Sequence, residues 1–427
     1  MSRGSLKEAA APVARPTNRA AGFQRTSSKR IALPLEHDAT EEIMSIQMGP
    51  SHPASHGTIK FNLKLDGELV VDCDVEVGYL HRAFEKMTEQ GTWTQVIPYT
   101  DRLNYVSPLI NNVGYALAVE KLCGIRVPER CEVIRVIMSE ISRVTDHLTC
   151  LGMAANEVGA MTAGFLMIEA REALWDIVEA VTGARLTVSY TRIGGVTRDF
   201  SPDIPDRVHG ALKNVRAILA DCDKLLTRNR IFYERMADVG VISAEDAISF
   251  GLTGPLLRSC GVNYDVRKAQ PYSGYERFDF DVPLGTKGDN YDRFLCRVNE
   301  IEQSMHIIEQ ALQALRPGPV CIDDPRFVLP PKQRVYNSIE GLMHHFKLIM
   351  EGAKVPRGEA YQAVEGANGE LGFYVVSDGS GRPYRVRVRP PCFLGMAALG
   401  DMLKGYMLAD IIPTFGMINM IGGECDR

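Results

Sequence analysis

The sequence predicts an α+β protein with a central helix bundle and small antiparallel β-sheets. Long stretches in the middle repeat apolar residues every three or four positions, which is typical of helices that pack against one another. Shorter stretches near both ends alternate apolar and polar residues, which is typical of antiparallel strands. Because no internal repeat or low-complexity linker follows residue 40, we expect residues 41–427 to form one body.

A small antiparallel sheet is predicted for residues 41–80. Residues 41–49 supply its first strand. The stretch "TIKFNLKLDGELVVDCDVEVGY", which begins at Thr58, contains two alternating runs joined by Asp66-Gly67, a dipeptide typical of tight hairpin turns. The segment 49–58 is then a loop between strands.

Residues 81–320 are predicted to be mainly helical. Pro128 and Pro205 are placed as in the first turn of a helix, while Gly183 and Pro317 mark helix ends. The four long helices are predicted at residues 128–154, 163–183, 203–236 and 289–315. They fit a bundle better than isolated surface helices.

Residues 321–427 are predicted to contain a helix, a hairpin and a final helix. The hairpin corresponds to "LGFYVVSDGSGRPYRVRVR", residues 371–389, and the last helix to residues 393–412. The apolar stretch "IIPTFGMINMIGG" that follows is short and interrupted by proline and glycine, so we expect a buried tail. No segment reaches the roughly 18 uncharged apolar residues of a membrane span.

The charge distribution sets residues 1–40 apart as a basic N-terminal arm. The whole chain has a net charge of −5, which gives no indication of nucleic-acid binding. Within the first thirty residues only Glu8 opposes a set of basic side chains, namely Arg3, Lys7, Arg15, Arg19, Arg25, Lys29 and Arg30. An organelle transit peptide is one interpretation. We prefer an extended arm that orders against a partner, because no amphipathic arginine helix is evident.

Two histidines four residues apart, His52 and His56 in "GPSHPASHGT", raise the possibility of a zinc site. Pro53 directly follows His52 and disfavours the helix that such a site needs. The glutamate of a HExxH protease is also missing. The ten cysteines contain no CxxC pair and are expected to be reduced thiols, so we predict no metal bound by this chain.

Six motifs occur in order across residues 45–427. They are "GPSHPASHGT", "GYLHRAFEK", "TDRLNY", "QPYSGYERFDFDVP" with "GDNYDR", "MHHFKLIMEG" and "SDGSGRPYRVRVRPP". Together they closely resemble the 49 kDa (D-type) subunit family of respiratory complex I, the proton-translocating NADH–quinone oxidoreductase. The resemblance implies a fold like that of the large subunit of nickel–iron hydrogenases, to which the family is related.

The resemblance also implies that the hydrogenase metal site has been lost. In "RLNYVS", Asn104 and Ser107 stand at the positions of the hydrogenase cysteines, and Cys425 alone remains near the C-terminus. A membrane-bound hydrogenase is therefore disfavoured, because too few thiolates remain for nickel. In the family the vacated cavity holds a quinone headgroup.

By resemblance, His56 and Tyr105 bind the quinone and form the catalytic set together with Glu157. A tyrosine hydroxyl and a histidine can both donate protons to a quinone that accepts two electrons. Most relatives carry an aspartate where Glu157 stands, so any ion pair between Glu157 and His56 would need a different spacing. His52 is interpreted as a loop-shaping residue.

Two further residues are expected near a [4Fe-4S] cluster in the neighbouring subunit. Arg82 in "GYLHRAFEK" matches an arginine beside that cluster, although an ordinary surface ion pair is the alternative interpretation. Thr187 stands where many relatives have a histidine, and losing that titratable group should lower the cluster potential. We therefore predict a low-potential quinone such as menaquinone.

The expected partners are complex I subunits B, C, I and H, with quinone as the substrate. Of these, B carries the cluster and H lies in the membrane. The chain would lie peripherally on the cytoplasmic face of a bacterial inner membrane, or on the matrix side in a mitochondrion. Two rivals remain open: a related complex that takes electrons from reduced deazaflavin or ferredoxin, and a purely structural scaffold.

Overall fold

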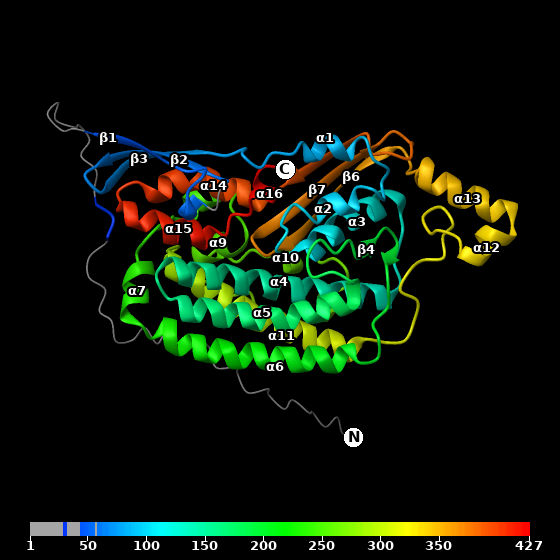
Figure 1. The fold of residues 1–427 in the computed structure, drawn as a ribbon, viewed down its shortest axis with the longest axis horizontal. Coiled ribbons are helices and arrows are strands. Elements are labelled where there is room, and N and C mark those ends of the chain that lie inside the picture. Colours follow the sequence, from blue (N-terminus) through cyan, green and yellow to red (C-terminus); the bar gives the residue numbers. More distant parts are fainter. Residues whose placement is uncertain (1–28, 32–42, 56–57) are drawn as a thin grey trace, which may run out of the picture.

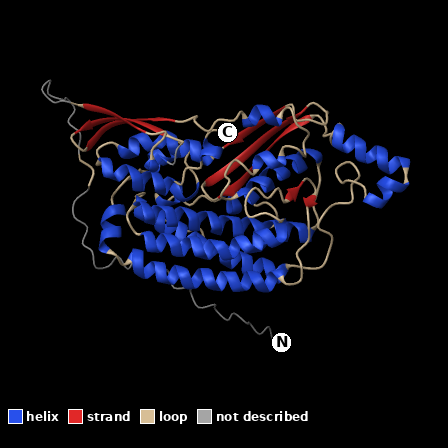
Figure 2. Ribbon diagram, viewed as in Figure 1, coloured by secondary structure: helices blue, strands red, loops and turns tan. Residues whose placement is uncertain are grey.

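The computed structural model describes residues 29–31, 43–55 and 58–427, and it combines long helices with small antiparallel sheets. The α+β prediction is therefore confirmed. Figure 2 shows the long helices side by side as one layer, with the sheets at the opposite face of the molecule. The sheet β1–β3 and the helix pair α12–α13 lie at opposite ends (Figure 1).

Helix α4 is the longest and lies at the centre of the bundle, where it contacts α3, α5, α11 and α15. The long helices are α3 (Pro108–Cys123), α4 (Glu129–Glu157), α5 (Met161–Thr182), α6 (Ile204–Cys222) and α11 (Asn290–Ala314). Sequence periodicity predicted four of them, and Gly183 ends α5 in the left-handed conformation, as expected. Helix α3 was not predicted.

The single helix predicted for residues 203–236 is wrong. Helix α6 ends at Cys222, a π-helical turn covers Asp223–Thr227, and a separate helix α7 spans Arg230–Met236. The Asn229 side chain accepts a hydrogen bond from the backbone N–H of Ile231 at 2.8 Å. That bond caps α7 and starts a new helix, since Asn is among the preferred N-cap residues.

Two three-stranded antiparallel sheets lie against the helices. The first is ordered β1 (Met44–Met48), β2 (Lys60–Asp66), β3 (Leu69–Glu76), and its hairpin confirms the predicted turn at Asp66-Gly67. The second is ordered β6 (Gly358–Gly366), β7 (Gly369–Ser377), β8 (Arg385–Arg389), and it confirms the C-terminal hairpin while adding the unpredicted β6. A two-stranded pair, β4 (Thr191–Arg192) and β5 (Gly195–Val196), completes the described strands.

The single last helix predicted for residues 393–412 is also wrong. Helix α14 ends at Leu403, and Gly405 adopts a left-handed φ of 82° before a 3-10 turn leads into α15. The predicted buried tail is helix α15 followed by α16. The shorter helices are α1 (Phe84–Thr88), α2 (Ile97–Thr100), α8 (Ala244–Ser249), α9 (Gly254–Ser259), α10 (Val266–Ala269), α12 (Lys332–Asn337), α13 (Ile339–Met350), α14 (Pro391–Leu403), α15 (Ile411–Ile418) and α16 (Gly422–Cys425).

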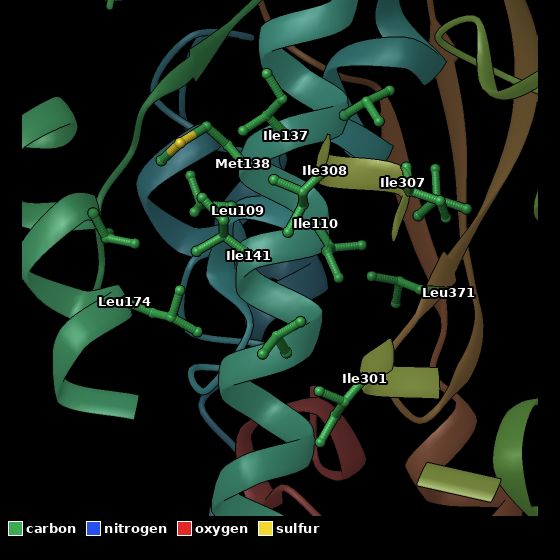
Figure 3. Close-up of a cluster of buried hydrophobic side chains, with 14 of the residues drawn as sticks. Leu109, Ile110, Ile137, Met138, Ile141, Leu174, Ile301, Ile307, Ile308 and Leu371 are labelled. Carbon is green, nitrogen blue, oxygen red and sulfur yellow. The ribbon is translucent and has the colours of Figure 1, made fainter. Parts of the chain in front are cut away.

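An apolar core joins the bundle to the second sheet. Figure 3 shows side chains of α3, α4, α5, α11 and β7 converging on one cluster, including Leu109, Ile137, Leu174, Ile308 and Leu371. Each of these five side chains is no more than 2% exposed. Their burial supplies most of the favourable free energy that holds these elements together.

Charged side chains are also buried in this core, and they are paired. Glu140 and Arg143 of α4 form an ion pair with an N–O distance of 3.2 Å, and Arg267 contacts Glu140 at the same distance. Arg143 also donates to the backbone carbonyls of Glu365 and Gly366, at 2.7 and 2.8 Å. These bonds fix the β6–β7 turn over α4.

Replacing Arg143 with methionine should strongly destabilise the protein. The change leaves the two carbonyls without their donor and Glu140 with one cation fewer, a class of loss that costs about 3–5 kcal/mol. Urea unfolding of the purified protein measures it. Arg326→Met is the matched control, because Arg326 pairs with Asp324 at the surface and should contribute about 1 kcal/mol or less. Equal effects of the two changes would contradict the central role of Arg143.

Candidate functional site

A cavity of about 280 Å³ lies where α4, the turn before α3 and the C-terminal helices meet. Its walls come from four parts of the chain and are mostly apolar. The lining residues are Thr58, Tyr105, Val106, Thr149, Cys150, Met153, Phe415, Gly416, Asn419, Met420, Ile421 and Gly422. The volume is close to the lower end of the range for small-molecule pockets. A smaller hollow of about 150 Å³ beside Pro128 contains none of the predicted site residues.

Tyr105 lies on the wall of this cavity, as the motif "TDRLNY" led us to expect for a site residue. The residue is 39% exposed, so a molecule in the cavity can contact it. Burial raises the pKa of Tyr105 above its usual value of about 10, the nearby Cys392 adds to that shift, and Arg82 opposes it. The hydroxyl therefore remains protonated at neutral pH and can donate.

The side chains of Asn104 and Ser107, on either side of Tyr105 in the sequence, both point into the protein interior. The Asn104 amide and the Ser107 hydroxyl donate to the same oxygen of Asp146, at 2.9 and 2.7 Å. All three residues are at most 3% exposed. At the two positions that the resemblance assigns to lost cysteines, the chain thus has neutral hydrogen-bond donors directed at a carboxylate.

His56 lies outside the described residues, so its predicted role stays a prediction. The described part of its loop contains only a short 3-10 turn, Pro53–Ser55, in place of the α-helix that a paired-histidine zinc site needs. Ser55 is buried, and its hydroxyl donates to the carbonyl of His52 at 2.9 Å. Thr58, two residues after His56, lines the cavity.

Glu157 ends helix α4 and lies behind the cavity wall. A Cβ atom added at Gly416, a lining residue of α15, would be 2.0 Å from Oε2 of Glu157, so only glycine allows this approach. Cys150 donates to the Gly416 carbonyl with an S–O distance of 3.6 Å. Glu157 therefore contacts the wall and is not itself one of the lining residues.

Arg82 and the segment of Thr187 both lie against the turn that carries Tyr105. Arg82 donates to the carbonyl of Arg102 at 2.8 Å. Thr187 has a left-handed φ of 52°, and two residues later the backbone N–H of Ser189 donates to Asp101 at 2.9 Å. The structure therefore brings Tyr105 and Arg82 to one turn, and it places Thr187 two residues before Ser189, which bonds to Asp101 at the start of that turn.

The C-terminal end of the chain has a structural role that the sequence did not lead us to expect. The backbone N–H groups of Gly78 and Leu80 donate to the Asp426 carboxylate at 2.9 and 2.8 Å, and His81 bonds to its carbonyl. These bonds hold the segment that leads to Arg82. The polar end "GGECDR", directly after an apolar tail, is the feature that could have indicated it.

Glu424 of α16 is a second residue that was not predicted. It is 2% exposed and accepts a hydrogen bond from the backbone N–H of Cys392 at 3.2 Å. Burial raises the pKa of Glu424, the hydrogen bonds from Cys392 oppose that rise, Asp146 adds to it and Arg389 opposes it, so that the pKa is about 7. A carboxyl group that titrates near neutral pH therefore lies one helix turn beyond the cavity-lining Ile421 and Gly422.

The described part of the chain offers neither a metal centre nor a membrane span. No group of three or more His, Cys, Asp or Glu side chains in residues 29–31, 43–55 and 58–427 could hold a metal ion. In those same ranges no helix has the length and apolar character needed to cross a membrane.

Comparison with known proteins identifies the family. The profile of the family described as "Respiratory-chain NADH dehydrogenase, 49 Kd subunit" matches residues 157–427, more than half of the chain. A D-type subunit of NADH-quinone oxidoreductase from Sorangium cellulosum is 56% identical over 393 residues, which is 92% of this chain and 97% of that protein. The D-type subunit of Myxococcus xanthus is 55% identical over 90% of this chain and 92% of the relative.

A further relative is a fused protein. The NADH-quinone oxidoreductase C/D protein of Bdellovibrio bacteriovorus is 50% identical over 387 residues, which is 91% of this chain and 69% of the relative. Each of these three relatives covers at least 90% of this chain. The chain therefore belongs to the family of the 49 kDa subunit of respiratory-chain NADH dehydrogenase, the NADH–quinone oxidoreductase also called complex I.

Proposed function

We propose that the cavity beside Tyr105 binds the headgroup of the quinone and that this chain supports its two-electron, two-proton reduction. The observation that carries the proposal is a mostly apolar cavity with a protonated tyrosine hydroxyl on its wall. A quinone ring is flat and apolar apart from two carbonyl oxygens, so such a cavity complements it. The names of the relatives include quinone as the electron acceptor.

The chemistry requires donors placed at the quinone oxygens. Negative charge develops on these oxygens as electrons arrive, and a fixed hydroxyl stabilises it without reorganisation. Tyr105 supplies one donor from the cavity wall. His56, two residues before the lining residue Thr58, is the second donor in this proposal. Glu157 contributes a carboxylate that contacts the lining residue Gly416 from behind the cavity wall.

The hydrogenase alternative conflicts with the residues present. A nickel site needs thiolates at positions 104 and 107, where Asn104 and Ser107 instead bond to Asp146. A complex fed by reduced deazaflavin or ferredoxin is less favoured, because the relatives are named as NADH-dependent enzymes.

The turn around Tyr105 is also the proposed boundary with the cluster-bearing subunit. Arg82 and Ser189, which follows Thr187 by two residues, bond to residues of this turn from segments other than those that line the cavity. In the proposal a [4Fe-4S] cluster of the neighbouring subunit lies near Arg82 and Thr187 and passes electrons to the quinone. The threonine at position 187 cannot titrate, which supports a cluster potential without pH dependence and a low-potential quinone such as menaquinone.

Other subunits of complex I are the proposed partners of the remaining surface. Helix α13 exposes apolar side chains, including Ile339 at 74% and Phe346 at 61%, as is typical of a face covered by a partner. The fused C/D relative supports the C-type subunit as one neighbour. In the proposal subunits B, I and H are the others, with this chain on the cytoplasmic face of a bacterial inner membrane.

Tyr105→Phe and His56→Ala should each lower quinone reductase activity of the assembled complex by about 100-fold, because each removes a proton donor. Reduction of an artificial acceptor by NADH should persist, and a native gel checks assembly. Tyr374→Phe is the matched control, since Tyr374 is remote from the cavity lining and its hydroxyl bonds to Glu359. Normal quinone activity in both variants would favour a structural scaffold.

Glu424 should make the stability of the C-terminal segment pH-dependent. Its pKa is about 7 in the folded protein and about 4.3 in an unfolded chain, so the folded state binds the proton more tightly. The stability contributed by the neutral carboxyl is fully present below about pH 4 and falls by about 1.4 kcal/mol per pH unit up to pH 7.

Glu424→Gln cannot titrate and should remove this slope. Hydrogen exchange of the peptide that contains α16, compared between the variant and the wild type at each pH from about 5 to about 8.5, measures the difference. The variant should gain protection relative to the wild type as pH rises to about 7, with no further gain above it. If the ratio of exchange protection between variant and wild type stays constant over this pH range, Glu424 does not titrate there.

A further inference from the structure

We propose that Asp146 is the positioning residue of the cavity, a single buried carboxylate that holds the Tyr105 turn and the C-terminal wall in register with α4. The inference rests on the proposed quinone site and extends it to a residue that does not line the cavity. Asp146 lies in the middle of α4 and its side chain is fully buried. Nothing in the helical pattern around it distinguishes this aspartate from its neighbours.

One oxygen of Asp146 holds the turn. Its Oδ2 accepts hydrogen bonds from Asn104 Nδ2 at 2.9 Å and from Ser107 Oγ at 2.7 Å. These donors stand one residue before and two residues after Tyr105. The side-chain carbonyl oxygen of Asn104 also accepts from the backbone N–H groups of Val106 and Ser107, at 3.1 and 3.3 Å. The backbone on both sides of Tyr105 is therefore tied to Asp146.

The other oxygen holds the opposite wall. Oδ1 of Asp146 accepts from Asn419 Nδ2 at 2.7 Å, and the same amide donates to Asn368 Oδ1 at 2.7 Å. Asn419 lines the cavity and follows α15 with a left-handed φ of 58°. Thr149, the first lining residue of α4, follows Asp146 by less than one helical turn. One side chain thus connects three of the four parts of the chain that line the cavity, all but Thr58.

The arrangement specifically requires a carboxylate. Three neutral donors converge on this side chain, and an ionised carboxyl is the only side chain of that size that offers two oxygens and no donor of its own. An asparagine at position 146 would place an N–H₂ group against either the Ser107 and Asn104 donors or the Asn419 amide. One wall would then lose its bond and move.

Small displacements of a donor have large effects on rate, since a shift of about 1 Å can cost about 100-fold. We therefore expect Asp146→Asn to lower kcat/KM for quinone by about 10- to 100-fold in the assembled complex. NADH oxidation with an artificial acceptor should stay within about twofold of the wild type, because that reaction does not use the cavity.

A double-variant cycle distinguishes positioning from a general structural role. If Asp146 acts through Tyr105, Asp146→Asn should add little to the loss already caused by Tyr105→Phe, since the hydroxyl to be positioned is gone. Independent effects would multiply instead. The proposal would be overturned if the activity losses of the two single variants multiply in the double variant, or if Asp146→Asn alone leaves quinone kinetics unchanged.

Glu120→Gln is the matched control. Glu120 is also buried and accepts three bonds, two from Arg135 and one from the backbone N–H of Gly194. It lies near the far end of α3, about 18 Å of helix beyond the Tyr105 turn. This variant should reduce the amount of complex without changing kcat/KM for quinone. A fall in kcat/KM equal to that of Asp146→Asn would show that any buried loss disturbs the cavity and would overturn the assignment to Asp146.

Ser107→Ala keeps the test informative if Asp146→Asn does not assemble. It removes one of the three donors and leaves the carboxylate bonded to Asn104 and Asn419, so the expected loss in kcat/KM is about 3- to 10-fold. Unchanged kinetics would count against the proposal. The underlying quinone site is judged separately: if Tyr105→Phe is fully active, the proposed function fails, whereas an active Asp146→Asn beside an inactive Tyr105→Phe refutes only the positioning role.

Discussion

The pairing of buried charged and polar side chains along the middle of α4 is the constraint on which the rest of the structure depends. Glu140, Arg143, Asp146 and His147 lie within about two helical turns and are all fully buried. A charged or polar group buried without a partner is costly, so each of these side chains dictates what packs beside it. His147, for example, lies 2.7 Å from Glu300 of α11. Burial lowers its pKa more than the neighbouring carboxylate raises it, so the imidazole is neutral.

The cavity is a consequence of how this helix is anchored. In its middle, α4 is held by the ion pair between Glu140 and Arg267 and by the hydrogen bonds from Arg143 to the β6–β7 turn. Towards its C-terminus, its side chains line the cavity. Thr149, Cys150 and Met153 follow Asp146 within two helical turns. The same helix thus carries part of the core, the proposed anchor of the walls and one wall, so a change at Asp146 reaches the cavity directly.

Local patterns were enough to predict much of the fold but little of the site. The Asp66-Gly67 hairpin and the ends of α5 and α11 depend on residues close in sequence, and they were found. The break at Asn229 was missed, because the apolar periodicity of the predicted helix continues across it. Glu140 and Arg267 are 127 residues apart, and no local pattern indicates such a pair. Tyr105 was found only through the family resemblance, and Asp146 was hidden in a helical pattern that it also satisfies.

The state of the cysteines near the cavity favours hydrogen-bond chemistry over thiolate chemistry. Burial raises the pKa of Cys150 to about 11 and that of Cys392 well above its usual value, and the neighbouring Glu424 raises the latter further. Both side chains therefore stay thiols, and the thiolate is the form that acts as a nucleophile or a soft-metal ligand. The carboxylate of Asp146 is surrounded by neutral donors, namely the Asn104 and Asn419 amides and the Ser107 hydroxyl. Its negative charge is therefore buried and bonded to three donors instead of lying on the cavity surface, which suits the proposed quinone, a ligand that gains charge only during reduction.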